Sequence, residues 1–315
     1  MYNWLIYEEY FVRTTLSKHY FQLFILLLAS INSYAMSTEH SLQSVYESDN
    51  RVDVYSAPSS IQELGRSIPA QFNNETFVNK GGSYLLQSVS LARRHRSNCP
   101  DVKFSEQIIG PKCTGFLVAP NVVMTAGHCM TTPEDCTNFL WAFDFKLKAA
   151  KDSSYTSIPA SSVYSCKKVL AQKYEYFEGQ DYALIQLDRN VEGRSPLAID
   201  FDSDYAVGTA HFVLGYPSGL PLKYADSGIL SKELEKVYYT TLDTFHGNSG
   251  SPTFDATTNK VTGIVSMGNG DYVWNSSGTC KEVKVTRVDD KYSSSTSFKI
   301  KLMKEVFDQA IQSSH

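Results

Sequence analysis

Short apolar runs rich in Val, Ile, Tyr and Phe recur from about residue 99 onward, separated by Gly, Pro, Asn and Asp. Runs of this length, bounded by turn-forming residues, are typical of β-strands joined as hairpins. Their regular recurrence predicts an all-β fold, either a sandwich or a pair of barrels. The clearest runs are Gly115–Ala119, Val122–Ala126, Val163–Leu170, Tyr182–Leu187, His211–Leu214, Val237–Thr241 and Val261–Val265.

The two ends of this region depart from the strand pattern. Apolar residues from Phe298 to Ile311 fall near helical spacing, which predicts an amphipathic helix over about residues 297–313. We expect its apolar face to pack on the chain's own barrel, with partner binding as the alternative. Residues 36–79 are polar and lack sustained apolar periodicity. They indicate a propeptide or a flexible lead-in, with an extension that stays attached as the alternative.

An apolar stretch, Phe21–Ile31, follows the basic residues Arg13 and Lys18 and precedes a small-x-small pattern at residues 33–35. This arrangement is typical of a secretory signal peptide. We therefore predict that residues 1–35 are a signal peptide and that the protein is secreted, to the cell exterior or to a periplasm. An uncleaved anchor is the alternative, but the run is shorter than the roughly 20 residues that span a bilayer.

Composition narrows the classes of partner and of metal chemistry. With 29 basic and 33 acidic residues, the net charge of −4 gives neither a nucleic-acid footprint nor a polybasic membrane patch. We therefore expect no nucleic-acid partner and, after signal cleavage, no membrane partner. The six cysteines are an even number in a chain that reads as exported, which favours disulfides over metal ligands. The sequence contains no C-x-x-C pair, so a structural zinc site is not expected.

Three motifs together supply the groups that amide hydrolysis by a hydroxyl nucleophile requires. They are Thr125-Ala-Gly-His-Cys129, Asp181-Tyr-Ala-Leu-Ile-Gln-Leu187 and Gly247-Asn-Ser-Gly-Ser-Pro252. The chemistry needs a nucleophile, a base, a carboxylate that orients the base, and donors for the oxyanion. These roles fall to Ser249, His128, Asp181, and the backbone amides of Gly247 and Ser249.

In this order the motifs resemble those of the trypsin/chymotrypsin superfamily, and the serine motif is similar to that of bacterial glutamyl-endopeptidase-type and trypsin-like peptidases. The resemblance covers about residues 105–290. It implies a chymotrypsin-like domain over residues 80–315, made of two six-stranded antiparallel β-barrels and a C-terminal helix. The first barrel would span about residues 105–200 and the second about 201–290. An α/β-hydrolase is excluded, because it needs the order Ser, acid, His and a Gly-x-Ser-x-Gly elbow.

The resemblance also assigns roles outside the three motifs. It implies a disulfide between Cys113 and Cys129, a hydrogen bond from Ser266 to Asp181, and a pocket wall at Gly268. The other four cysteines allow three pairings that the sequence does not separate. Of these we expect Cys136 with Cys166, both in the first barrel, and Cys99 with Cys280 as the remaining pair.

Specificity and maturation are harder to infer. Asp243 matches the floor of the specificity pocket in trypsin-like enzymes and Thr244 follows it, which predicts a preference for Arg or Lys at the cleaved bond. The alternative is a loop carboxylate turned away from the pocket and capped by backbone amides. Val265 stands where glutamate-specific relatives carry a histidine, so glutamate preference is disfavoured. Asn248 replaces the aspartate that pairs with a new N-terminus in animal trypsins, so a zymogen would be controlled by other means.

The sequence therefore predicts a secreted, monomeric serine endopeptidase that acts on proteins or peptides through an acyl-enzyme, with no metal or cofactor. The alternative is a protease-fold protein that only binds, as an adhesin or decoy does. Such proteins usually lose one member of the triad, whereas here His128, Asp181 and Ser249 all lie in intact motifs.

Overall fold

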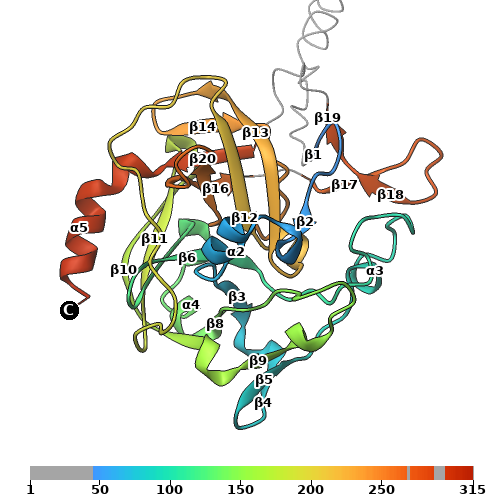
Figure 1. Ribbon diagram of the computed structural model, residues 1–315, viewed down its shortest axis with the longest axis horizontal. Helices are drawn as coiled ribbons and strands as arrows, with labels where there is room; N and C mark the ends of the chain where they lie inside the picture. The colour runs from blue at the N-terminus through green and yellow to red at the C-terminus, as the bar shows by residue number, and fades with distance from the viewer. Residues whose placement is uncertain (1–44, 268–269, 287–294, 315) are drawn as a thin grey trace, which may run out of the picture. The chain divides into compact units, whose positions relative to one another are not determined.

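A computed structural model describes residues 45–267, 270–286 and 295–314, so the expected signal peptide and Gly268 lie outside the described residues. The elements are mostly strands (Figure 1). The strands are β1 (Val45–Tyr46), β2 (Val52–Asp53), β3 (Ala70–Asn73), β4 (Phe77–Asn79), β5 (Ser83–Leu86), β6 (Cys113–Ala119), β7 (Val122–Thr125), β8 (Phe139–Ala142), β9 (Ser157–Pro159), β10 (Val163–Glu175), β11 (Gln180–Leu187), β12 (Ala210–Gly215), β13 (Lys223–Glu233), β14 (Val237–Thr240), β15 (Pro252–Asp255), β16 (Val261–Met267), β17 (Tyr272–Trp274), β18 (Lys281–Val283), β19 (Val285–Thr286) and β20 (Ser295–Lys299). The helices are α2 (Ser59–Gly65), α3 (Leu91–Arg94), α4 (Asp135–Asn138) and α5 (Lys304–Gln312).

The first barrel is a closed antiparallel ring in the order β10-β11-β7-β6-β3-β8. Both β6 and β7 are buried along their whole length. Their near-continuous apolar sequences suit strands that are covered on both faces. The large side chains Phe72, Phe116 and Trp141 fill the interior. This packing gives His128, which follows β7, a rigid support.

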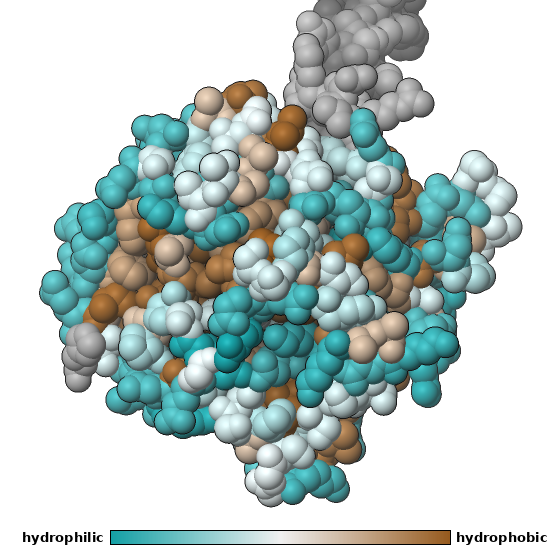
Figure 2. All heavy atoms as spheres, viewed as in Figure 1, coloured by the Kyte–Doolittle hydropathy of each residue, from teal (hydrophilic) through white to brown (hydrophobic). Residues whose placement is uncertain are grey.

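The second barrel takes the order β12-β15-β16-β20-β14-β13 and closes through the β12–β13 pairing. Its strands are also antiparallel, and β2 adds to the outer edge of β13. The two six-stranded barrels confirm the predicted fold class. Figure 2 shows hydrophilic residues over most of one face, with apolar residues visible mainly toward its middle.

The structure differs from the sequence prediction at the start of the domain. Residues 36–79 were expected to precede it, yet β2 and β3 belong to the two barrel sheets. Ala70 pairs with Thr114 of β6 and with Ala142 of β8, so β3 closes the first barrel. The barrel thus begins well before residue 105. A strand of four residues is too short for its alternation to stand out from a polar background.

The C-terminal segment is partly strand and partly helix. Residues 295–299 form β20, where Phe298 pairs with Val237 and Ile264, and α5 begins only at Lys304. The helix packs on its own chain, with the Phe307 ring 5.1 Å from that of Phe201. Within the described ranges, no helix is long and apolar enough to span a bilayer.

Three disulfides join the six cysteines: Cys113–Cys129, Cys136–Cys166 and Cys99–Cys280. The first links the start of β6 to the residue after His128, as the resemblance implied. The second ties α4 to β10 within the first barrel. The third fastens the β17–β18 hairpin to the segment after α3 (Figure 1). Each pairing is the one expected from the sequence.

Candidate active site

His128 is held by Asp181 at two points. The backbone N–H of His128 donates to Oδ1 of Asp181 at 2.9 Å, and the ring Nδ1 lies 2.7 Å from Oδ2. The Asp181 side chain is 4% exposed, whereas the His128 side chain is 27% exposed. Because a buried carboxylate occupies Nδ1, Nε2 is the ring nitrogen left for proton transfer.

The backbone around His128 leaves no room for a side chain at Gly127. A Cβ there would lie 1.9 Å from the carbonyl oxygen of Lys173, on the neighbouring strand β10. On the other side, Ser266 donates a hydrogen bond from Oγ to Oδ2 of Asp181, as the resemblance implied. The carboxylate thus accepts three hydrogen bonds, and these fix its orientation toward the imidazole.

Ser249 lies half-buried in the loop between β14 and β15. Its carbonyl oxygen accepts from the N–H of Thr114 at 2.8 Å and lies 3.8 Å from Sγ of Cys129. The loop that carries Ser249 therefore rests against the residue next to His128. In the described part of the chain, no hydrogen bond joins Oγ of Ser249 to the His128 ring. Such bonds are often long before substrate binds.

Two backbone donors beside Ser249 have no acceptor among the described residues: the N–H groups of Gly247 and Ser249. The alternate amides are used internally, because Asn248 donates to Phe245 at 2.9 Å and Gly250 donates to Val265 at 2.8 Å. Gly247 has a φ of 95°, and a Cβ there would lie 2.3 Å from the carbonyl oxygen of Tyr216. Glycine is thus required where the two free amides are formed, and such a pair can bind one oxyanion.

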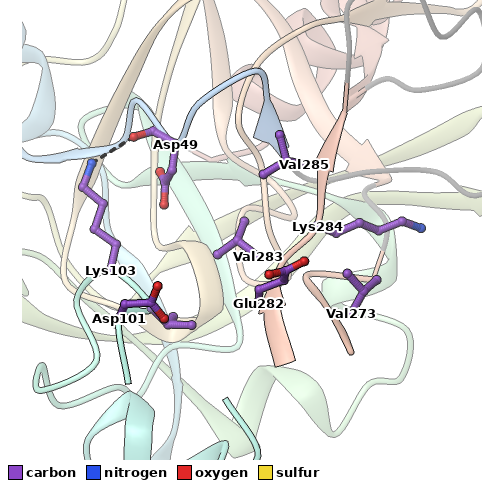
Figure 3. A pocket seen from close by; sticks show the side chains of 9 residues that line it. Asp49, Asp101, Lys103, Val273, Glu282, Val283, Lys284 and Val285 are labelled. Atoms are coloured by element: carbon purple, nitrogen blue, oxygen red, sulfur yellow. Dashed lines mark hydrogen bonds between the residues drawn. The ribbon is translucent and has the colours of Figure 1, made fainter. Parts of the chain in front are cut away.

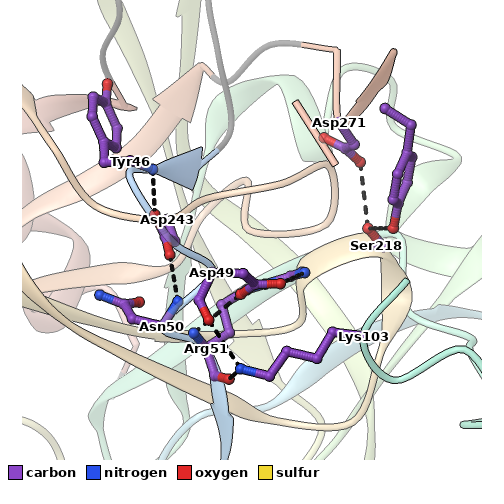
Figure 4. Close-up of polar contacts among 9 residues, drawn as sticks. Tyr46, Asp49, Asn50, Arg51, Lys103, Ser218, Asp243 and Asp271 are labelled. Carbon is purple, nitrogen blue, oxygen red and sulfur yellow. Dashed lines mark hydrogen bonds and ion pairs between the residues drawn. The ribbon is translucent and has the colours of Figure 1, made fainter. Parts of the chain in front are cut away.

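Asp243 does not face an open pocket. It is 1% exposed, and its two carboxylate oxygens accept from the backbone N–H groups of Tyr46 and Asn50, each at 2.9 Å (Figure 4). This corresponds to the alternative left open by the sequence, a carboxylate capped by amides. Thr244 is also buried, and its hydroxyl donates to Oγ of Ser295 at 2.9 Å.

Sequence reasoning missed the segment that caps Asp243. Within it, Arg51 forms a paired contact with Asp49, with Nε and Nη2 at 2.8 and 2.7 Å from its oxygens. The guanidinium lies 3.5 Å over the Phe245 ring, and the side chain is 1% exposed. In the sequence, only the neighbouring charges of Asp49 and Arg51 could have indicated this buried segment, but an ordinary surface ion pair would give the same pattern.

Burial of Asp243 makes the stability of the fold depend on pH. Burial raises the pKa of its carboxyl to about 6 from 3.8, against the opposing effect of the Asn50 and Tyr46 amides. Between pH 4 and 6 the folded state therefore binds a proton that the unfolded chain has lost. The stabilisation of the folded state by this proton is complete below about pH 4 and disappears as the pH rises through 6. Between pH 5 and 7, wild type should lose about 1 kcal/mol more unfolding free energy than Asp243→Asn.

Urea unfolding of both proteins at pH 5 and 7 measures this difference. Asp188→Asn is the matched control, because Asp188 is an exposed carboxylate that pairs with Arg189. Equal losses for wild type and Asp243→Asn would show that Asp243 does not titrate in this range.

Two sizeable cavities among the described residues lie away from the triad. One of 590 Å³ lies beside the segment around Asp49 that caps Asp243. It is lined by Asp49, Asp101, Val102, Lys103, Val273, Glu282, Val283, Lys284 and Val285 (Figure 3). One group of possible metal ligands, Cys113, His128 and Cys129, does fall at the site. Its two sulfurs are joined in a disulfide, so neither is a thiolate that could bind a metal.

Residues 113–264, which include all three motif residues, match the family model of the trypsin-like peptidase domain. This part of the chain is therefore similar to a trypsin-like peptidase domain. The chain is also similar to curated proteins from two bacilli. One is a glutamyl endopeptidase from Bacillus licheniformis, 27% identical over 47% of this chain and 47% of that protein. The other is an extracellular metalloprotease from Bacillus subtilis, 32% identical over 45% of each.

The chain spans about half the length of the curated relatives it matches. The fold of the trypsin-like domain is also found in the solved structure of the VesB protease of Vibrio cholerae. That likeness has a TM-score of 0.50 at 14% identity and covers 82% of this chain and 66% of that one. At so low an identity it concerns the fold alone.

Proposed function

We propose that this protein is a secreted serine endopeptidase that cleaves proteins or peptides through an acyl-enzyme. The observation that carries the proposal is the double contact of Asp181 with His128, beside a loop that offers Ser249 and two free amides. An isolated Gly-x-Ser-Gly turn would need none of these contacts. The three disulfides support export, because they persist in oxidising compartments.

In the proposed reaction each residue of the site has a separate role. Oγ of Ser249 attacks the peptide carbonyl carbon while Nε2 of His128 takes its proton, and the carbonyl oxygen becomes an oxyanion bound by the Gly247 and Ser249 amides. The C–N bond then breaks as His128 returns the proton to the leaving amine. Water, deprotonated by the same ring, attacks the acyl-enzyme and releases Ser249. Asp181 keeps the proton of the neutral ring on Nδ1 and stabilises the imidazolium.

Preference for Arg or Lys through Asp243 is not part of this proposal, because both carboxylate oxygens already accept backbone amides. The glutamyl specificity in the name of the Bacillus licheniformis relative is the other candidate. Val265 argues against this candidate, because the resemblance leads us to expect a histidine at that position in glutamate-specific enzymes. We therefore propose endopeptidase activity without assigning the residue at the cleaved bond.

Labelling with a fluorophosphonate probe tests the proposal directly. An activated serine forms a covalent adduct with the phosphorus, so wild type should be labelled and Ser249→Ala should not. Ser218→Ala is the matched control, because Ser218 is a buried serine whose hydroxyl contacts Asp271 and Tyr272. Failure of folded wild type to react, before and after limited proteolysis, would favour the binding-protein alternative.

A further inference from the structure

A second histidine beside Ser249 is held in the same manner as His128. The His246 N–H donates to both carboxylate oxygens of Asp271, at 3.1 and 3.3 Å, and the ring Nδ1 lies 3.0 Å from Oδ1. Asp271 also accepts from the Ser218 hydroxyl at 3.4 Å (Figure 4). The Asp271 side chain is 9% exposed, but that of His246 is 75% exposed. The ring is therefore fixed in orientation and open to solvent.

The position of His246 makes contact with substrate possible. It directly precedes Gly247, whose N–H is one of the two proposed oxyanion donors. The hydrogen bond and charge of Asp271 raise the pKa of His246, which favours the cationic ring. With Nδ1 bonded to the carboxylate, the outward group of that cation is the Nε2–H donor. A donor held in place loses little conformational freedom when it binds an acceptor.

A chain of contacts links His246 to α3: its partner Asp271 directly precedes Tyr272, whose ring lies 5.5 Å from that of His95. Burial lowers the pKa of His95, which directly follows α3; the charge of Asp271 opposes this effect, and the charges of Arg94, Lys281 and His246 add to it. The Cys99–Cys280 disulfide fixes the segment after α3 to the β17–β18 hairpin, which carries Lys281. Asp271 is the acidic side chain that contacts His246, while Asp101 and Glu282, from the same two segments as Arg94 and Lys281, line the 590 Å³ cavity.

We propose that His246, Arg94 and Lys281 form a basic rim that binds acidic side chains flanking the cleaved residue of a peptide substrate. The high exposure of His246 places this contact at the surface of the site and not within a closed pocket, so the rim selects flanking residues and not the cleaved residue itself. Opposite charges near the scissile bond also speed encounter. The inference rests on the proposed function, since it concerns the same site.

Matched peptides that carry Glu or Gln at the positions flanking the cleaved residue test the rim. Wild type should show a ratio of kcat/KM for Glu over Gln of about 10 at low salt, the lower range for hydrogen bonds to a charged group at an exposed site. The ratio should fall to within about twofold of unity in His246→Gln and in Arg94→Gln/Lys281→Gln. His246→Lys should restore it, because it returns a cation. Lys260→Gln removes an exposed lysine in the β15–β16 turn and should leave the ratio near 10.

Binding to the Ser249→Ala variant gives a second readout that does not need turnover. Fluorescence anisotropy should give about tenfold tighter binding of the Glu peptide than of the Gln peptide, and His246→Gln in that background should remove the difference. A Glu preference that survives His246→Gln, or the absence of any preference, would overturn the rim. If the Ser249→Ala variant prefers the Glu peptide but wild type cleaves neither peptide, the rim is supported and the endopeptidase proposal fails.

Discussion

Asp181→Asn is expected to lower kcat by about 10⁴-fold while the domain stays folded. The carboxylate accepts from the backbone N–H of His128, from its ring and from Ser266. An asparagine whose oxygen keeps the backbone bond turns its NH₂ group toward Nδ1. Nδ1 must then accept, and the ring proton moves to Nε2, where the ring can no longer take the proton of Ser249.

Steady-state hydrolysis of a peptide library with purified variants measures this effect, and Asp188→Asn serves as a control for loss of a carboxylate. If Asp181→Asn keeps kcat within tenfold of wild type and only the pH dependence of kcat near neutral pH is shifted, Asp181 does not have an orienting role. A loss of solubility would leave labelling at Ser249 as the readout, made on the folded fraction.

Gly250→Ala is expected to remove the native fold or lower its melting temperature by about 10 °C or more. Gly250 has a φ of 84°, and an added Cβ would lie 2.1 Å from Oγ1 of Thr125 and 2.2 Å from the carbonyl oxygen of Thr114. These atoms belong to β7 and β6, which cannot move without opening the first barrel. The loop that carries Ser249 would be pushed off the strand that leads to His128.

Gly208→Ala separates steric conflict from backbone strain. Its φ of 94° is similar, but no atom lies within 4 Å of an added Cβ. Only the cost of a left-handed alanine applies there, about 1 kcal/mol, or about 2–4 °C in a domain of this size. Thermal unfolding followed by circular dichroism compares the two, and similar shifts for both would show that the Ser249 loop tolerates the side chain.

The sequence was most informative where a residue type is needed for local reasons. The His128, Asp181 and Ser249 motifs each join a strand end to a turn, and apolar runs marked most of the strands around them. The helix over 297–313 was only partly right, since Phe298 fits either a helix or a strand and its partners in β14 and β16 are distant in sequence.

Two features depended on contacts that no local pattern records. The residues of β3 are ordinary in isolation and become a barrel strand only by pairing with β6 and β8. Asp243 is likewise an acidic loop residue until Tyr46 and Asn50 supply their amides from almost 200 residues away. Long-range pairing of this kind overrides short-range preference. The polar composition of residues 36–79 and the analogy for Asp243 therefore both gave assignments that the structure changed.

The pairing of the first described strands with late ones has a consequence for biosynthesis. Val45 of β1 pairs with Val285, and Val52 of β2 pairs with Tyr224. A ribosome must therefore deliver most of the domain before these early strands find their neighbours, while β6 and β7 can pair as soon as both have emerged. Because distant contacts slow folding, we expect a nascent chain to hold a finished hairpin near His128 and an unattached leading segment until synthesis is almost complete.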